Sequence, residues 1–208
     1  MTNPPPRYAG PPAGHPPQTQ VMTDRAVFTE AYAVIPKGVM RDIVTSNLPH
    51  WHGTRAWVLA RPLTGFAETF AQMIVEIAPG GGSDHPEPDT SAQAVLFVTD
   101  GNITIRLDGG THDLGPGGYA YLPPASGWTI HNDGDAPATL HWVRKRYVAV
   151  DGIDQPPAFF TSDAAIAPTA MPGTDGRWAT TRFVDPSDLR HDMHVNIVTF
   201  EPGACIQK

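Results

Sequence analysis

The sequence is poor in cysteine: Cys205 is the sole one among 208 residues. One cysteine cannot form an internal disulfide, so nothing in the composition points to secretion. No stretch approaches the roughly 18 consecutive apolar residues that a membrane-spanning helix needs. Residues 1–20 also lack the apolar centre of a signal peptide. We therefore expect a cytoplasmic protein without a membrane partner.

Basic charge is also scarce. The formal net charge is -7 and the pI is about 5.6. Because phosphate backbones are bound by basic faces, this balance argues against nucleic acid as a main partner. Hydrophobic residues make up 40% and charged residues 17% of the chain. This composition is typical of a folded globular protein.

A third absence is helical periodicity, which no long segment shows. The chain instead contains 23 prolines and 20 glycines. Seven of the prolines fall within the first 17 residues, so residues 1–20 are expected to be a flexible Pro/Gly-rich arm or a docking peptide. The remaining prolines and glycines mostly bound short apolar runs. This punctuation favours an all-β fold.

Short strands are expected throughout residues 21–147. Residues 68–77 alternate, with Phe70 and Ile74 on one face and Met73 and Val75 on the other. Hairpin signals follow, at residues 100–101 and 108–110. Strands at this regular spacing predict a closed barrel or jelly roll over residues 21–147.

The C-terminal third differs in composition from the region of expected strands. Residues 148–185 are rich in Pro, Gly and Asp, and about 38 residues is too long for an ordinary loop, so they are expected to connect two domains. Residues 73–80 and 196–203 echo each other, each a strand followed by Pro-Gly, which suggests a duplicated domain. Residues 186–208 would then begin a second, truncated domain. Its lone strand at 194–200 would expose an unpaired edge, which favours a homo-oligomer or a missing barrel.

Residues 80–132 resemble the two motifs of the cupin family, whose His and Glu side chains hold a divalent metal inside the barrel. The positions that carry the resemblance are Gly82, His85, Glu87, Gln93 and Gly101 for the first motif, and Gly117, Pro123, Trp128 and Asn132 for the second. His85 alone matches a ligand type, since Trp128 stands where the family has its third His and indole cannot ligate a metal. We expect no metal in this barrel. Its former site would be a degenerate pocket formed by His85, Glu87, Gln93 and Trp128.

A closer resemblance is to bacterial (S)-ureidoglycine aminohydrolases. It rests on residues 23–29, 141–147, 171–178 and 191–203. The resemblance implies a cupin fold with one complete barrel and the first strand of a second. It also implies release of ammonia from (S)-ureidoglycine to give (S)-ureidoglycolate, with a small ureide as the partner and manganese in the second barrel. The family's manganese ligands follow the Pro-Gly matched here by Pro202-Gly203, so we expect no catalytic residue, no manganese and no activity in the 208-residue chain.

Several residues have two interpretations. His85 and Glu87 could form a vestigial pocket or a solvated loop. Arg144, Lys145 and Arg146 could bind an anion or lie in a surface or subunit contact. If residues 194–200 form a strand whose exposed face lines a second barrel, His194 and Asn196 are candidate substrate-binding residues.

His191 and His194 would make a metal pair on a helix, but their surroundings predict a strand. Cys205 lies in no nucleophile motif.

Three functions remain open. The protein is, or derives from, a manganese-dependent ureidoglycine aminohydrolase. Alternatively, the barrel is a non-catalytic scaffold or small-molecule binding module. A metal-dependent isomerase or dioxygenase would need ligands in the first barrel, and Trp128 argues against it.

Overall fold

The computed structural model describes residues 26–29, 32–36, 44–45, 48–62 and 69–204. The predicted arm at residues 1–20 and Cys205 lie outside these ranges. Within them the chain is built from strands and one 3-10 turn at Asp163–Ala165, which confirms the all-β prediction. None of the described helices is long and apolar enough to cross a membrane.

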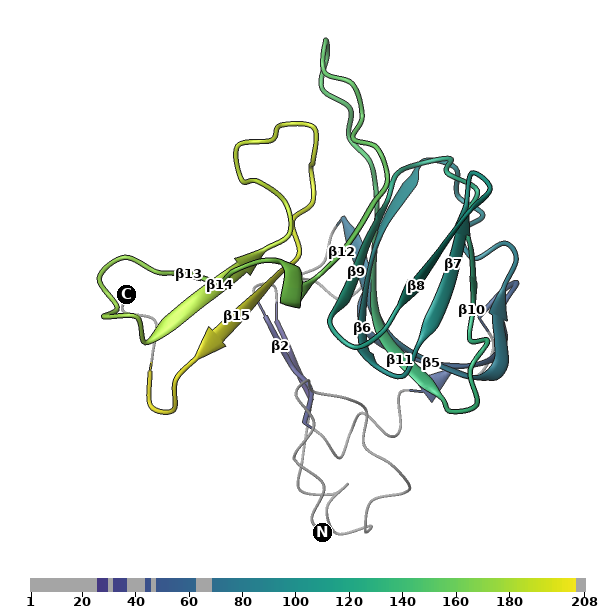
Figure 1. Cartoon of the computed structure of the whole chain (residues 1–208), viewed down its shortest axis with the longest axis horizontal. Helices are drawn as coiled ribbons and strands as arrows, with labels where there is room; N and C mark the ends of the chain where they lie inside the picture. Colours follow the sequence, from purple (N-terminus) through teal and green to yellow (C-terminus); the bar gives the residue numbers. More distant parts are fainter. Residues whose placement is uncertain (1–25, 30–31, 37–43, 46–47, 63–68, 205–208) are drawn as a thin grey trace, which may run out of the picture.

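A ten-stranded antiparallel sheet curls into a nearly closed barrel (Figure 1). Its order is β12-β9-β6-β11-β5-β10-β7-β8, with β4 also pairing β5 and β3 pairing β4. The ring of His112 on β8 stacks at 3.6 Å on Phe160 of β12, so side chains link the two ends of this path. The strands are β3 (Val44–Thr45), β4 (His52–Ala60), β5 (Phe70–Ser83), β6 (Ala92–Asp100), β7 (Ile103–Leu107), β8 (Gly110–Leu114), β9 (Gly118–Leu122), β10 (Thr129–His131), β11 (Ala138–Arg146) and β12 (Phe159–Ser162).

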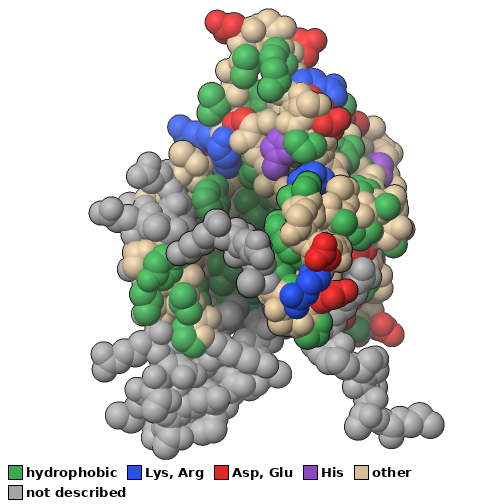
Figure 2. All heavy atoms as spheres, turned by 90° about the vertical axis from the view of Figure 1, so that its left-hand side faces the viewer, with side chains coloured by type: hydrophobic (Ala, Val, Ile, Leu, Met, Phe, Trp, Pro, Cys, Tyr) green, Lys and Arg blue, Asp and Glu red, His purple; other side chains and the backbone are tan. Residues whose placement is uncertain are grey.

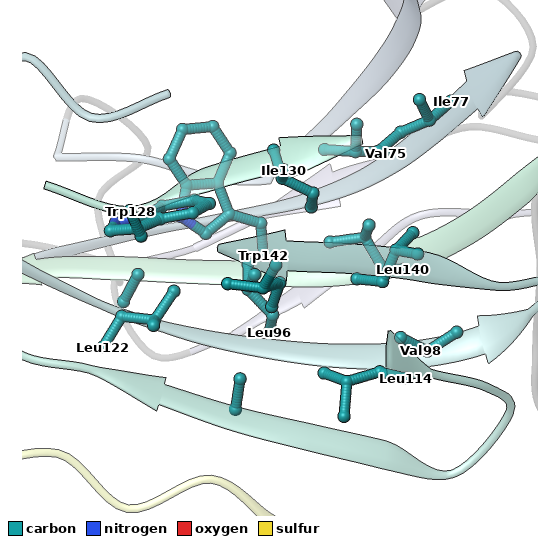
Figure 3. Packing of buried hydrophobic residues seen from close by; sticks show 14 of the residues in the cluster. Val75, Ile77, Leu96, Val98, Leu114, Leu122, Trp128, Ile130, Leu140 and Trp142 are labelled. Atoms are coloured by element: carbon teal, nitrogen blue, oxygen red, sulfur yellow. The ribbon is translucent and has the colours of Figure 1, made fainter. Parts of the chain in front are cut away.

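The barrel interior is apolar because alternate residues of each strand point into it. On β6 the inward residues are Ala94, Leu96 and Val98, all at most 1% exposed. Figure 3 shows Leu96 and Val98 packed with neighbours from β5, β10 and β11. Full burial of each Leu, Ile or Val side chain contributes roughly 1.5–3 kcal/mol, so this interior is the main source of the barrel's stability.

Gly82 allows two strands to approach closely at the end of the barrel. It pairs with His131 of β10 and has φ 143°, and a Cβ at this position would lie 2.1 Å from the carbonyl oxygen of Ile130. A side chain here would therefore force β5 and β10 apart. The sequence predicts that residues 79–82 (Pro-Gly-Gly-Gly) end this strand, whereas β5 continues through them to Ser83.

The C-terminal third contains more strands than the sequence predicted. β12 lies within the expected connector at 148–185 but pairs with β9 of the barrel. β13 (Thr169–Ala170), β14 (Trp178–Arg182) and β15 (Asn196–Phe200) form a separate sheet. Whether this sheet begins a second barrel stays a prediction. A short hairpin of β1 (Val27–Phe28) and β2 (Ala33–Val34) precedes the barrel.

The three-stranded sheet packs on the outside of the barrel. A second hydrophobic cluster joins outward residues of β6 and β9, among them Phe97 and Tyr119, to Phe183 and Met193 of the C-terminal part. Tyr119 and Phe183 stack with their ring centroids 4.1 Å apart. Burial raises the pKa of Tyr119 far above its usual range, so this phenol stays neutral.

Asp192 fastens the C-terminal segment to the barrel at the edge of this cluster. Its carboxylate accepts hydrogen bonds from Lys145 Nζ at 2.5 Å, the Val148 amide at 2.8 Å and the Gln93 amide. Gln93 in turn accepts a hydrogen bond from the Tyr121 hydroxyl at 2.9 Å. Burial acts to raise the pKa of Asp192, but these hydrogen bonds outweigh it and hold the pKa below its usual range.

We expect Asp192→Asn to lower the free energy of unfolding by about 2 kcal/mol at pH 7, because Lys145 loses its charged partner in a partly buried site. A depressed carboxyl pKa stabilises the protein above the unfolded value of about 3.9, and this contribution is lost as the pH falls through the lower folded value. Urea denaturation at pH 7 and pH 3 should therefore show the gap between wild type and variant shrinking. Asp133→Asn, which breaks the exposed pair with Arg106, is the control and should change stability by less than about 0.5 kcal/mol. An equal gap at both pH values would contradict the role of Asp192.

Ala125 lies in the turn between β9 and β10 with φ 57°, in the left-handed region. It stands at the Gly position of the second cupin motif. A residue with a Cβ is strained there by about 1–2 kcal/mol. The protein therefore carries local backbone strain at one wall of the barrel mouth.

Ala125→Gly should raise the free energy of unfolding by about 0.5–1 kcal/mol, since relief of strain exceeds the extra entropy of glycine in the unfolded chain. Urea denaturation measures the change. Ala125→Val should destabilise, because a β-branched residue tolerates positive φ still less. If Gly destabilises as much as Val, the turn does not carry this strain.

Candidate functional site

The mouth of the barrel holds a small cavity of about 100 Å³. It lies between the loop that joins β5 to β6 and the turn at 123–127. His85, Glu87 and Trp128 all line it, together with Ser126. The structure therefore brings together three of the four residues predicted for the degenerate pocket.

Gln93, the fourth predicted residue, does not lie at this mouth. β6 alternates, so its neighbour Ala94 points into the barrel while Gln93 points outward to Tyr121 and Asp192. The prediction that Gln93 belongs to the pocket is therefore wrong, because its side chain lies on the other face of β6. Its amide is fully buried and holds the C-terminal segment.

Glu87 is fixed by an ion pair. Arg144 Nε donates to Glu87 Oε2 at 2.5 Å and Arg144 Nη2 donates to Oε1 at 2.6 Å. The Glu87 side chain is 6% exposed, so this pair neutralises a nearly buried carboxylate. The same guanidinium lies 5.8 Å from the ring centroid of Trp142. Glu87 thus has a cationic partner from the protein itself.

The basic run on β11 holds two different segments. Arg146 contacts Asp89 at 3.1 Å, so Arg144 and Arg146 both bind the loop at the barrel mouth. Hydrogen bonds from Ser91, together with Arg146, lower the pKa of Asp89 to about 2. Lys145 points to the opposite side and contacts Asp192. All three predicted anion-binding candidates are therefore engaged by carboxylates of the chain.

Trp128 is packed as a core residue. It is 5% exposed and meets Trp142 edge-on with ring centroids 6.3 Å apart, as Figure 3 shows. The position of the third cupin His is thus filled by an indole. Among the residues that the structure describes, no group of three or more His, Cys, Asp or Glu side chains could hold a metal ion. Because Glu87 is bound to a guanidinium and Trp128 cannot ligate, the mouth does not fit a divalent metal.

His191 and His194 are not a metal pair on a helix. The His191 ring is buried edge-on against Tyr121, and its Nδ1 has no hydrogen-bond partner among the described residues. Burial lowers the pKa of His191, with the nearby Asp188 carboxylate opposing the shift. The ring of His194 lies 6.5 Å away, and His194 is exposed. His191 therefore packs on the barrel strands β9 and β12, through Tyr121 and Phe159.

Asn196 is the first residue of β15, whereas His194 lies before this strand, outside the small sheet. Val195 and Ile197 pack in the second cluster, and His194, Asn196 and residues 198–200 are exposed. A shared face of His194 and Asn196 that binds a substrate stays a prediction.

The register of β14 and β15 adds a residue that sequence reasoning missed. Arg182 stands directly opposite Asn196, and Trp178 stands opposite Phe200, stacked at 5.5 Å. Directly opposite residues of an antiparallel pair share a face. Arg182 therefore shares a face with Asn196, and its Nη2 lies 3.8 Å from the sulfur of Met171. The sequence signal of Arg182 is weak because residues 178–182 fall within the expected connector at 148–185.

Comparisons with known proteins agree with this architecture. Residues 73–144 match the Cupin domain family. The chain is 28% identical over 189 residues to (S)-ureidoglycine aminohydrolase of Escherichia coli (strain K12), covering 88% of this chain and 68% of that protein.

Two solved structures are similar over nearly the whole chain. One, from Pseudomonas aeruginosa, carries the name glyoxylate induced protein and is 59% identical, with a TM-score of 0.85 and coverage of 94% of this chain and 71% of its own. The other, protein Ylba of E. coli, is 25% identical, with a TM-score of 0.74 and coverage of 91% and 72%. The predicted cupin fold of the barrel is thus confirmed. The chain belongs to the cupin family and is related to (S)-ureidoglycine aminohydrolase.

Proposed function

We propose that the protein acts in ureide catabolism as a relative of (S)-ureidoglycine aminohydrolase, in a reaction that releases ammonia from (S)-ureidoglycine to give (S)-ureidoglycolate. The observation that carries this proposal is the similarity to the E. coli enzyme over 88% of the chain. A small ureide is the proposed partner. The cytoplasm is the proposed location, and a homo-oligomer the proposed assembly.

Manganese is the metal proposed for this reaction, and the first barrel does not supply its ligands. Glu87 is neutralised by Arg144, and Trp128 occupies a ligand position. No step of the reaction is therefore placed in this barrel. We propose that the 208-residue chain by itself neither holds manganese tightly nor releases ammonia.

The first test measures bound manganese by elemental analysis and ammonia release from (S)-ureidoglycine with manganese added. We expect the chain to show neither, while the E. coli enzyme, assayed in parallel, shows activity. Tight metal binding that is lost in His85→Ala would overturn the assignment of the barrel mouth. Manganese-dependent turnover by the chain would overturn the proposed inactivity.

A second candidate function is that the barrel is a scaffold, or a module that binds a small molecule. The favouring observation is that its polar groups hold other parts of the chain: Arg144 holds the mouth loop, and Lys145 with Gln93 holds Asp192. A barrel built in this way positions the C-terminal sheet instead of carrying out chemistry.

If the mouth is structural, Glu87→Gln should lower the free energy of unfolding by about 1–3 kcal/mol, because Arg144 loses its charged partner near a buried site. Thermal and urea denaturation measure the loss. Glu76→Gln, which weakens the more exposed pair with Arg55 on β4, is the control and should change stability by less than about 1 kcal/mol. A Glu87→Gln variant as stable as wild type would contradict a structural role for the ion pair.

A further inference from the structure

We propose that His52 and His131 form a binding site for a divalent metal ion of the zinc class on the outer surface of the barrel. The two imidazoles supply two ligands, and water supplies the others. The inference goes beyond the proposed function, because it concerns the outer surface of the barrel and not the pocket at its mouth.

Strand pairing brings the two histidines to one face. His52 of β4 and His131 of β10 both stand opposite Gly82 of β5, one on each side of it. Directly opposite residues of antiparallel strands project to the same face. Ile130, the neighbour of His131, is buried in the barrel interior, so the face of the two histidines is the outer one. Their ring centroids lie 6.2 Å apart.

Gly82 leaves open the space between the two histidines. A Cβ on Gly82 would lie 3.0 Å from Nδ1 of His131, so this nitrogen faces the strand that separates the two rings. Because all three residues share a face, any side chain at position 82 would project between His52 and His131. The glycine that lets β5 and β10 approach closely therefore also keeps a path open from one imidazole to the other.

Hydrogen bonds determine which nitrogen of each ring is free. Nε2 of His131 lies 2.9 Å from Oδ1 of Asp84, and Nε2 of His52 lies 3.2 Å from the carbonyl oxygen of Gly80. Carboxylate and carbonyl oxygens accept hydrogen bonds, so both Nε2 atoms carry the hydrogen. In a neutral imidazole the lone pair of Nδ1 is then free. Histidines that bind metals are held in the same way, with the second nitrogen donating to a carboxylate or a backbone carbonyl.

The separation of the rings fits a shared ion. Zinc–nitrogen bonds of about 2.0–2.1 Å at a tetrahedral angle place the centroids of two imidazoles about 5 Å apart, so the two rings have to close by about 1 Å. His52 is exposed and the ring torsion of a histidine is soft, so this ring can turn toward His131. Two protein ligands are fewer than the three or four of tight zinc sites, and the ion is therefore exchangeable.

The donor atoms select the metal. Imidazole nitrogen suits Zn²⁺, Cu²⁺ and Ni²⁺, whereas Mn²⁺ prefers oxygen ligands and stands at the weak end of the affinity order of divalent metals. Asp84 adds a negative charge beside His131, and its side chain is 88% exposed. A bound ion links β4 to β10 across β5, so it stabilises the folded barrel.

Two other pairs of imidazoles lie close together without this arrangement. The rings of His50 and His85 lie 5.5 Å apart, and among the described residues no acceptor orients them. The rings of His191 and His194 lie 6.5 Å apart. The His191 side chain is 5% exposed, and its Nε2 lies 3.9 Å from Asp188, too far for a hydrogen bond. On the face shown in Figure 2, which carries the C-terminal sheet, the described histidine side chains lie in separate places and form no continuous patch.

The test is a titration of the full chain, without a histidine affinity tag, with Zn²⁺ and with Mn²⁺ by calorimetry. We expect one Zn²⁺ ion to bind at this site and Mn²⁺ to bind at least tenfold more weakly. NMR of the histidine side-chain nitrogens identifies the ligands: before metal is added, His52 and His131 should carry the hydrogen on Nε2, and Zn²⁺ should shift both Nδ1 resonances. Zn²⁺ should also raise the melting temperature.

His52→Gln and His131→Gln should each weaken Zn²⁺ binding at least tenfold and abolish the rise in melting temperature. The double variant should lose little more than either single variant, because one ion uses both rings. Asp84→Asn should weaken binding about tenfold, since it loosens the hydrogen bond that orients His131. The amide spectrum of each variant reports whether the barrel is folded.

His85→Gln is the matched control. His85 is exposed, lies three residues after Gly82 and belongs to the neighbouring imidazole pair, so its loss should leave Zn²⁺ binding unchanged. Loss of binding in His85→Gln would place the ion at the barrel mouth and overturn the proposal. Full Zn²⁺ binding by folded His52→Gln or His131→Gln would overturn it as well, and so would Nδ1 shifts confined to other histidines. Ammonia release enters none of these measurements, so their outcome is independent of the proposed function.

Discussion

The structure depends on strands that are buried on both faces. β6, β9 and β11 form the wall between two apolar clusters, one inside the barrel and one between the barrel and the C-terminal sheet. Leu96 faces the first cluster and Val95 the second, and both are at most 1% exposed. A shift of one residue in the register would exchange the two faces, so the packing on both sides fixes the pairing. This constraint also places Gln93 outside the barrel and Ala94 inside.

The same wall carries the basic side chains of β11, which form ion pairs with two other segments of the chain. The end of β11 presents Arg144 and Arg146 to one side and Lys145 to the other, so one strand holds the mouth loop and the C-terminal segment at once. The guanidinium of Arg144 neutralises Glu87, which stands at a position where the cupin motif has a metal-binding His. The chemistry of the mouth is consequently that of an ion pair above an aromatic core, with Trp128 and Trp142 beneath it.

Much of the barrel could be predicted because its signals are local. The alternation at 68–77 and the hairpins at 100–101 and 108–110 are short-range patterns, and β5, β7 and β8 follow them. β12 could not be predicted, since four residues in a Pro-rich stretch become a strand only through pairing with β9. The pocket was predicted in part. His85, Glu87 and Trp128 follow from motif spacing, but a shift of one position decides whether Gln93 or Ala94 points inward.

The position of Arg182 could not be predicted from the sequence. Arg182 lies opposite Asn196 only because β14 pairs with β15 across a 13-residue gap, and no periodicity in the sequence encodes this pairing. Pairing alone would not distinguish it from Thr180, which lies on the same face opposite Val198. What separates Arg182 from Thr180 is its guanidinium, whose Nη2 lies 3.8 Å from the sulfur of Met171. The barrel positions this sheet through Asp192. This residue lies in the segment that leads into β15, and it accepts hydrogen bonds from Lys145 and from the amide of Val148. The barrel can thus determine where the strands of the C-terminal sheet lie.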